Sequence, residues 1–383
     1  MLLTITALLA FGLLMLYSSS ADYSVEILHE APGYMFKRQL LWLSLGVLTA
    51  VALSYLDYHY WRTFAVPIML GTIVSLIAVL FIRELRLGAV RTFYNGSIQP
   101  SELAKLVIII YLTVWLYAKR DQLHNIELGL MPLAIILGSI GGLIYLQPDL
   151  SAVATIFILG GILFFLAGAD LKQIIILIVF ASLVAWIIVQ FSATGQERVE
   201  FYWLGLKDPT RASYHVRRSL EAMVNGGIFG LGIGQSVTKL TGLPVPPTDS
   251  IFAVVAEEFG LVGATILILL YAVLVWRGLV IARRAPDMLG SLLATGLVFW
   301  IGIEALINMT VMVGLLPFAG NALPFMSSGG SNLVTSLAAI GILYNISRQH
   351  GEKTQDDWRA FGATADLRRR NGRRGVSRTR RSR

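Results

Sequence analysis

Charged side chains stand at the boundaries of apolar segments in this chain, where they could act on a molecule held at a membrane surface. Asp249 lies near the end of the polar stretch 192–250, just before a long apolar run that starts at Ile251. A carboxylate at such a boundary can accept a proton from a hydroxyl group, and it can also cap the helix that follows. Proton transfer and helix capping are therefore the two interpretations of Asp249.

Three more charged residues lie beside the starts of apolar runs. Glu102 and Lys105 are three residues apart in QPSELAK, so they share one face of a helix and could form an ion pair that satisfies itself. Asp149 follows Pro148 in LQPDLS, where it could bind a ligand or cap a helix. Each of the three is a candidate for substrate binding with a structural alternative.

Acidic residues inside apolar runs are costly in lipid, so each is a candidate for function. Glu257 and Glu258 lie roughly two turns beyond Asp249 if a helix starts there, and we expect them to be structural. Glu304 is followed by Asn308 four residues later, which favours interhelical hydrogen bonding over catalysis. The glycine-rich runs 225–240 and 323–333 would let the backbone come close to a ligand.

The composition indicates an integral membrane protein. Of 383 residues, 56% are hydrophobic and 14% are charged, which is more apolar mass than a soluble core of this size would absorb. We expect an all-α polytopic membrane protein, because stretches of about 17–25 apolar residues can each cross a bilayer. Ten transmembrane helices are predicted, at 2–19, 38–55, 63–82, 101–118, 128–146, 150–168, 172–191, 251–276, 288–312 and 331–347.

Positive charge predicts the orientation. Residues 351–383 hold eleven Lys or Arg and four acidic residues, so they carry +7 of the net charge of +8. Because basic segments stay on the cytoplasmic side, both termini should be cytoplasmic and the large loop 192–250, between the seventh and eighth helices, extracytoplasmic. The domain prediction is a membrane domain over 1–347 and a disordered basic tail over 348–383, which we expect to contact anionic lipids and not nucleic acid.

Some basic residues fall on the side predicted to be outside, against the usual charge bias. Arg38, Arg91 and Lys239 are among them, and they could bind an anionic head group or extend along the membrane interface. The chain has no cysteine, and its five histidines lack the spacing of metal ligands. No metal site or cofactor is therefore required by the sequence, although a divalent cation near a diphosphate would be compatible with it.

Six ordered motifs carry a resemblance to one family: KRQLLW at 37–42, QPSELAK at 99–105, LQPDL at 146–150, GGIFGLGIGQSVTKLTGLP at 226–244, PTDSIFAVVAEEFGLVG at 247–263 and NMTVMVGLLPFAGNALPFMSSGGSNL at 308–333. The chain resembles the SEDS family (shape, elongation, division and sporulation), the RodA, FtsW and SpoVE-like polymerases of bacterial cell-wall peptidoglycan. The similarity covers nearly the whole membrane region.

The resemblance implies a multi-pass glycosyltransferase of the bacterial cytoplasmic membrane. It would polymerise lipid II, an undecaprenyl diphosphate-linked disaccharide peptide, at the outer face with inversion, for cell division or elongation. A class B penicillin-binding protein transpeptidase is the implied partner. The family's catalytic aspartate maps onto Asp249, and its substrate-binding positions map onto Arg38, Arg91, Glu102, Lys105, Asp149, Ser327, Gly329 and Gly330, to which the outer-loop Lys239 is added.

The chain also departs from the family pattern. The usual histidine before the Thr-Asp pair is Pro247, the tyrosine of the serine-glycine motif is Ser328, its last serine is Asn332, and a common mid-span glutamine is Glu304. These departures bear on catalytic proficiency and on the choice between RodA-like and FtsW-like roles. The alternatives are a flippase for lipid-linked precursors and a noncatalytic scaffold for cell-wall synthesis.

Overall fold

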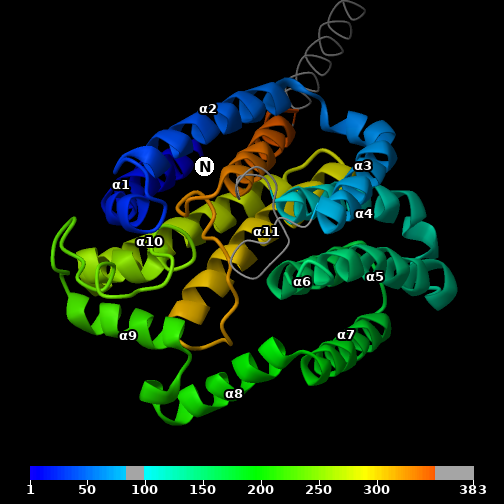
Figure 1. Cartoon of the computed structure of the whole chain (residues 1–383). Coiled ribbons are helices and arrows are strands. Elements are labelled where there is room, and N and C mark those ends of the chain that lie inside the picture. The colour runs from blue at the N-terminus through cyan, green and yellow to red at the C-terminus, as the bar shows by residue number, and fades with distance from the viewer. Residues whose placement is uncertain (83–98, 350–383) are drawn as a thin grey trace, which may run out of the picture.

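The protein is helical throughout the part of the chain that the structure describes. A computed structural model describes residues 1–82 and 99–349, and neither range contains a β-strand (Figure 1). The predicted residue Arg91 and the tail from 350 lie outside these ranges. The helices are α1 (Leu2–Glu26), α2 (Tyr34–Tyr55), α3 (Trp61–Ile82), α4 (Pro100–Lys119), α5 (Met131–Tyr145), α6 (Leu150–Leu166), α7 (Leu171–Phe191), α8 (Ala193–Lys207), α9 (Tyr214–Gly226), α10 (Ile251–Arg283) and α11 (Met288–Met312), followed by a helix over 330–349.

Each predicted span coincides with one of these helices. Within the residues that the structure describes, eight helical segments are long and apolar enough to cross a membrane, and α6 is a shorter apolar helix of 17 residues. The fifth span starts in a π-helical turn, Ile126–Leu130, which leads into α5. An all-helical membrane fold is thus confirmed, whereas ten crossings remain a prediction.

Helices α4 and α11 form the centre of the bundle (Figure 1). α11 packs against α10, α4 and α6, and α4 also packs against α3. In their most apolar stretches, 67% of the residues are buried inside the protein, against 6% in α7. The apolar side chains that α7 exposes must face lipid, whereas Glu102 and Lys105 of α4 and Glu304 of α11 are enclosed by protein. This difference in surroundings makes the central pair able to carry buried polar chemistry.

α10 is broken near its beginning. Gly260 has φ 66° and ψ −165°, which interrupts the helix between Phe259 and Leu261. The glycine-rich run 226–234 supplies the missing hydrogen bonds: Leu231 N donates to Glu257 O, and Leu261 N donates to Gly227 O, each over 3.0 Å. The predicted span 251–276 therefore lies within α10 but contains a break at Gly260, where the backbone of the preceding loop pairs with the helix.

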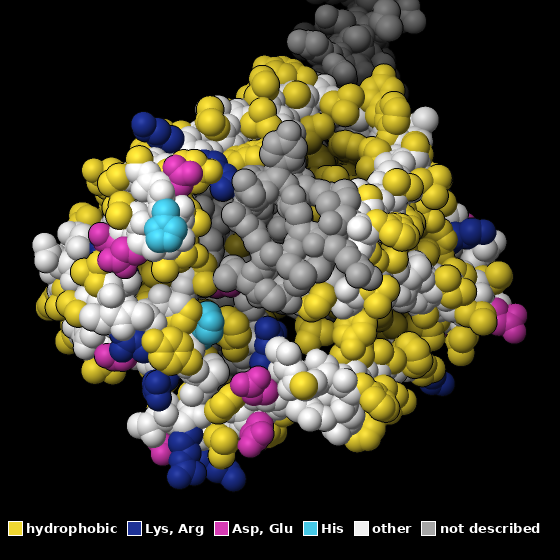
Figure 2. Space-filling view, in the orientation of Figure 1, with side chains coloured by type: hydrophobic (Ala, Val, Ile, Leu, Met, Phe, Trp, Pro, Cys, Tyr) yellow, Lys and Arg dark blue, Asp and Glu magenta, His cyan; other side chains and the backbone are white. Residues whose placement is uncertain are grey.

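The loop 192–250 contains two helices that its polar composition did not predict. α8 and α9 lie along the lower edge of Figure 1, and Figure 2 shows charged side chains gathered over them, while apolar side chains are spread over much of the upper and right parts of that view. α9 buries Val216, Ser219 and Ala222, which are three residues apart, and packs against α10. This spacing of small and apolar residues is what a short amphipathic helix requires.

At the opposite end of the bundle, a polar cluster joins two connections and one helix. His59 contacts Asp57 over 2.7 Å and Asp287 over 3.0 Å. The buried amide of Asn345 accepts from Tyr58 N and donates to Ser54 O. These contacts join the α2–α3 and α10–α11 connections to the helix 330–349.

Candidate active site

A cavity of about 250 Å³ lies where the starts of α2, α4, α6 and α10 meet the segment 320–332. Its polar lining comes from elements far apart in the sequence. The predicted site residues that line it are Arg38, Glu102, Lys105, Asp149, Asp249, Gly329 and Gly330. Seven of the ten predicted site residues therefore come together at one end of the bundle.

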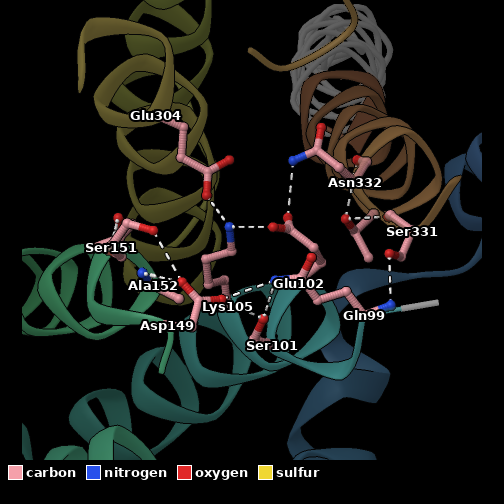
Figure 3. Close-up of polar contacts among 12 residues, drawn as sticks. Gln99, Ser101, Glu102, Lys105, Asp149, Ser151, Ala152, Glu304, Ser331 and Asn332 are labelled. Atoms are coloured by element: carbon pink, nitrogen blue, oxygen red, sulfur yellow. Dashed lines mark hydrogen bonds and ion pairs between the residues drawn. The ribbon is translucent and has the colours of Figure 1, made fainter. Parts of the chain in front are cut away.

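Lys105 lies at the base of this cavity between two carboxylates (Figure 3). Its ammonium group is 2.9 Å from Glu102 Oε1 and also donates to Glu304 of α11. Asn332 donates to the other Glu102 oxygen over 2.9 Å. The predicted self-satisfying pair is thus part of a longer chain of contacts. Both added partners, Glu304 and Asn332, are positions where the chain departs from the family pattern.

Asp149 acts as the N-cap of α6 and also ties this helix to α4 (Figure 3). Its Oδ1 accepts from Ala152 N over 3.2 Å and from Ser151 Oγ over 3.0 Å. Its Oδ2 accepts from Gln99 Nε2 and Ser101 Oγ over 2.9 and 3.0 Å. Asp149 therefore caps α6, as its structural interpretation proposed, and its two carboxylate oxygens accept hydrogen bonds from four donors.

Asp249 lies at the cavity wall, one residue before the N-cap position of α10, which is Ser250. Its Oδ2 faces Gly320: a Cβ added to that glycine would lie 2.9 Å from the carboxylate oxygen. The backbone carbonyl of Asp249 accepts a hydrogen bond from Asn308 Nδ2 over 2.9 Å. Glu304 and Asn308 thus each bond a residue outside α11, as the prediction of interhelical hydrogen bonding implies.

The segment 327–330 shapes one wall of the cavity. Gly330 lies against Trp42, and a Cβ on this glycine would be 2.4 Å from the indole ring. Ser327 is 3% exposed, and its hydroxyl donates to Thr248 O over 2.6 Å, so it stands behind the cavity wall and not in the lining. Ser328 N donates to Pro247 O over 2.8 Å, so two departures from the family pattern meet through their backbones.

Lys239 lies away from the cavity lining. Its ammonium group is 2.9 Å from Glu258 Oε1 and also bonds Ser18 O and Gly234 O. Glu257 accepts from the Ser236 and Thr238 side chains and from Thr238 N. The structural interpretation of the two glutamates agrees with these contacts, and Lys239 belongs to the same buried cluster.

Several lining residues were not among the predicted set, namely Gln39, Trp42, Gln99, Asn321 and Asn332. Gln39 donates to Ser327 O over 3.2 Å, and Asn321 is 6% exposed. Their proximity to charged motif residues was the available signal, since Gln39 adjoins Arg38 and Gln99 precedes Glu102 by three. Within 1–82 and 99–349, no group of three or more His, Asp or Glu side chains is arranged to hold a metal ion.

Known sequences that are similar to this chain agree with one another in their descriptions. A family profile described as "Cell cycle protein", covering FtsW, RodA and SpoVE, matches residues 1–352. The chain is 35% identical over 350 residues to a probable peptidoglycan glycosyltransferase FtsW of Geobacter metallireducens, covering 90% of this chain and 93% of that one. It is 36% identical over 346 residues to the stage V sporulation protein E of Bacillus subtilis, covering 89% and 94%.

Solved structures with the same fold include a chain of a peptidoglycan synthase complex that coordinates polymerisation and crosslinking. That chain superposes with a TM-score of 0.74 at 26% identity, over 91% of this chain and 97% of its own. The rod shape determining protein RodA of Thermus thermophilus superposes with a TM-score of 0.67 at 25% identity, over 91% and 96%. The helix arrangement described above is therefore shared with both.

Proposed function

Because this chain belongs to the FtsW, RodA and SpoVE family of cell cycle proteins, we propose that it is a peptidoglycan glycosyltransferase that polymerises lipid II. The observation that carries the proposal is the meeting of Asp249 and Arg38 in one polar cavity, at the end of a bundle whose outer helices face lipid. A membrane-borne diphosphate sugar could reach such a cavity from the bilayer.

The chemistry that we propose is a single displacement. The 4-hydroxyl of the acceptor sugar loses its proton to the carboxylate of Asp249, and its oxygen forms a bond to the anomeric carbon of the donor. The bond from that carbon to the lipid diphosphate breaks, and the electron pair leaves with the diphosphate. Arg38 is the lining residue suited to this negative charge, because a guanidinium pairs bidentately with phosphate oxygens.

Lys105 plays a less direct part in this proposal. Two carboxylates hold its ammonium group at 3% side-chain exposure, so it would have to give up a partner before contacting a diphosphate. We assign it to fixing α4 against α11 and to setting the charge of the cavity base. Arg91 is a proposed diphosphate-binding residue because of the family resemblance, and a divalent cation beside the diphosphate is compatible with this proposal.

The orientation and partner are proposed on the same basis. The cavity lies at the end where the loops 20–37, 192–250 and 313–330 converge, the side assigned to the outside by positive charge. We propose that this end faces outward in the bacterial cytoplasmic membrane, with ten crossings and both termini in the cytoplasm. The similar chain from a peptidoglycan synthase complex that coordinates polymerisation and crosslinking supports a crosslinking partner. We propose the partner that the family resemblance implies, a class B penicillin-binding protein transpeptidase.

The test is polymerisation of fluorescent lipid II by the purified full-length chain, alone and with candidate transpeptidases. We expect glycan ladders that are lost in Asp249→Asn. Asp208→Asn is the matched control, because Asp208 is an exposed loop carboxylate that bonds Thr210 N and lies outside the cavity. Ladders of wild-type intensity from Asp249→Asn would overturn the role of this carboxylate. Movement of lipid II between leaflets without ladders would favour the flippase alternative, and neither activity would favour the scaffold.

A further inference from the structure

Three consecutive carbonyl groups immediately before α10 are held by hydrogen bonds from elsewhere in the chain. Pro247 O accepts from Ser328 N over 2.8 Å, and Thr248 O accepts from Ser327 Oγ over 2.6 Å. Asp249 O accepts from Asn308 Nδ2 over 2.9 Å. We call residues 247–249 the aspartate strap. All of its donors belong to α11 or to the segment 321–332 that follows it.

Asn308 binds the strap and the neighbouring cavity wall at the same time. Its amide nitrogen donates to Asp249 O and, over 2.5 Å, to Asn321 O. The side chain is 1% exposed, so water cannot replace these bonds. Two backbone segments that line the cavity are therefore joined at one nitrogen atom.

Ser327 also binds the aspartate strap, at Thr248, one residue before Asp249. Its hydroxyl donates to Thr248 O and accepts from Leu323 N over 2.7 Å, which closes the turn 323–327 on the strap. The strap needs such donors because no regular element includes it: α10 begins only at Ile251. Buried carbonyls that lack partners would favour a different backbone path.

We propose that Asn308 and Ser327 are positioning residues that hold the carboxylate of Asp249 at its working place in the cavity. The proposal rests on the catalytic role of Asp249 put forward above. It assigns Ser327 a place behind the aspartate, in contrast to the substrate-binding role that the family resemblance implies. A displacement of a reacting group by about 1 Å can lower a rate by about 100-fold, so loss of either donor should slow turnover.

The first test compares Asn308→Ala with Asn345→Ala in the full-length chain. Asn345 is a suitable control because it is also a buried amide, 2% exposed, that bonds two backbone groups, but it does so at the far end of the bundle. We expect both variants to lower the unfolding temperature, and only Asn308→Ala to lower kcat for lipid II polymerisation, by roughly 10- to 100-fold, with little change in KM. Equal kcat losses in the two variants would overturn the proposal.

The second test does not depend on activity. Hydrogen–deuterium exchange of the purified protein should show faster exchange across 247–254 in Asn308→Ala and in Ser327→Ala, while Asn345→Ala should affect 54–60 instead. Unchanged exchange across 247–254 in both strap variants would overturn the proposal even if polymerisation were never observed. A wild-type chain without polymerase activity, but with these exchange changes, would contradict the proposed function and leave the strap intact.

Discussion

Lys105 of α4 and Glu304 of α11 form an ion pair inside the protein, with side-chain exposures of 3% and 2%. Glu102 binds the same ammonium group from the other side. Two carboxylates therefore share one lysine at the junction of the two central helices. The stability of the protein should therefore depend on which of these three side chains is removed.

Replacing Lys105 by Met should destabilise the protein strongly. The change leaves two buried carboxylates facing one another, and removal of one partner from a buried ion pair typically costs about 3–5 kcal/mol. Adding Glu304→Gln should recover part of the loss, because it removes one of the two opposed charges. Unfolding temperatures of the single and double variants in detergent check this, and a double variant no more stable than Lys105→Met would contradict the coupling.

Glu304→Gln alone should be far milder. The glutamine carbonyl can still accept from Lys105, and Glu102 still supplies a charge, so we expect polymerisation within about threefold of wild type and an unfolding temperature close to it. The companion change Asn332→Ser would restore the family pattern at the second contact of this cluster. A polymerisation rate more than tenfold below wild type in Glu304→Gln would mean that the carboxylate of Glu304 has a direct part in turnover.

Lys239→Met separates two interpretations of this residue. If Lys239 binds substrate, KM for lipid II should rise while the fold is kept. We expect instead a lower unfolding temperature with unchanged KM, because the variant leaves Glu258 buried without its lysine. The double variant with Glu258→Gln should regain stability, and a raised KM in that stable double variant would support the substrate-binding interpretation.

The positions of the long apolar helices could be predicted from the sequence, because the length of each apolar stretch indicates where a membrane helix lies. The second predicted span, 38–55, lies within α2, and the ninth matches α11 at both ends. The break at Gly260 and the helix α9 were not predictable in this way, since both depend on backbone pairing or packing with distant segments. The candidate site divides similarly: Asp249 and Glu102 were found as charges at span boundaries, whereas the contacts of Glu304 and Asn308 required the tertiary arrangement.

His215 gives a prediction about acid stability. It stacks on Phe318 with ring centroids 4.1 Å apart, and burial, followed by the positive charge of Arg198, lowers the pKa of His215 from 6.5 to about 4. The unfolded chain therefore binds a proton in this range before the folded chain does, and this contribution to stability is complete above pH 6.5 and is lost as the pH falls towards 4. His215→Phe should reduce the fall in unfolding temperature between pH 7 and pH 4.

The matched control for this measurement is His124→Phe. His124 is an exposed histidine in a different connection, where it contacts Asp170, so its replacement tests whether loss of any histidine produces the effect. Identical profiles for wild type and His215→Phe would contradict the assignment of this acid sensitivity to His215.

Gly260→Ala should disrupt the junction between α10 and the glycine-rich loop. The residue has φ 66°, and an added Cβ would lie 2.4 Å from both Gly230 N and Ile228 O, which are backbone atoms that cannot rotate away. Gly71→Ala is the control, because it lies in α3 with nothing within 4 Å of the new Cβ, and alanine is about 1 kcal/mol better than glycine in a helix. We expect poor yield or a clearly lower unfolding temperature for the first variant and equal or higher stability for the second.

The same substitution should affect catalysis. Because the loop contacts Glu257 and Glu258 only a few residues beyond Asp249, any Gly260→Ala protein that folds should also lose polymerase activity. A well-folded and fully active variant would mean that the break in α10 does not help to place the cavity wall.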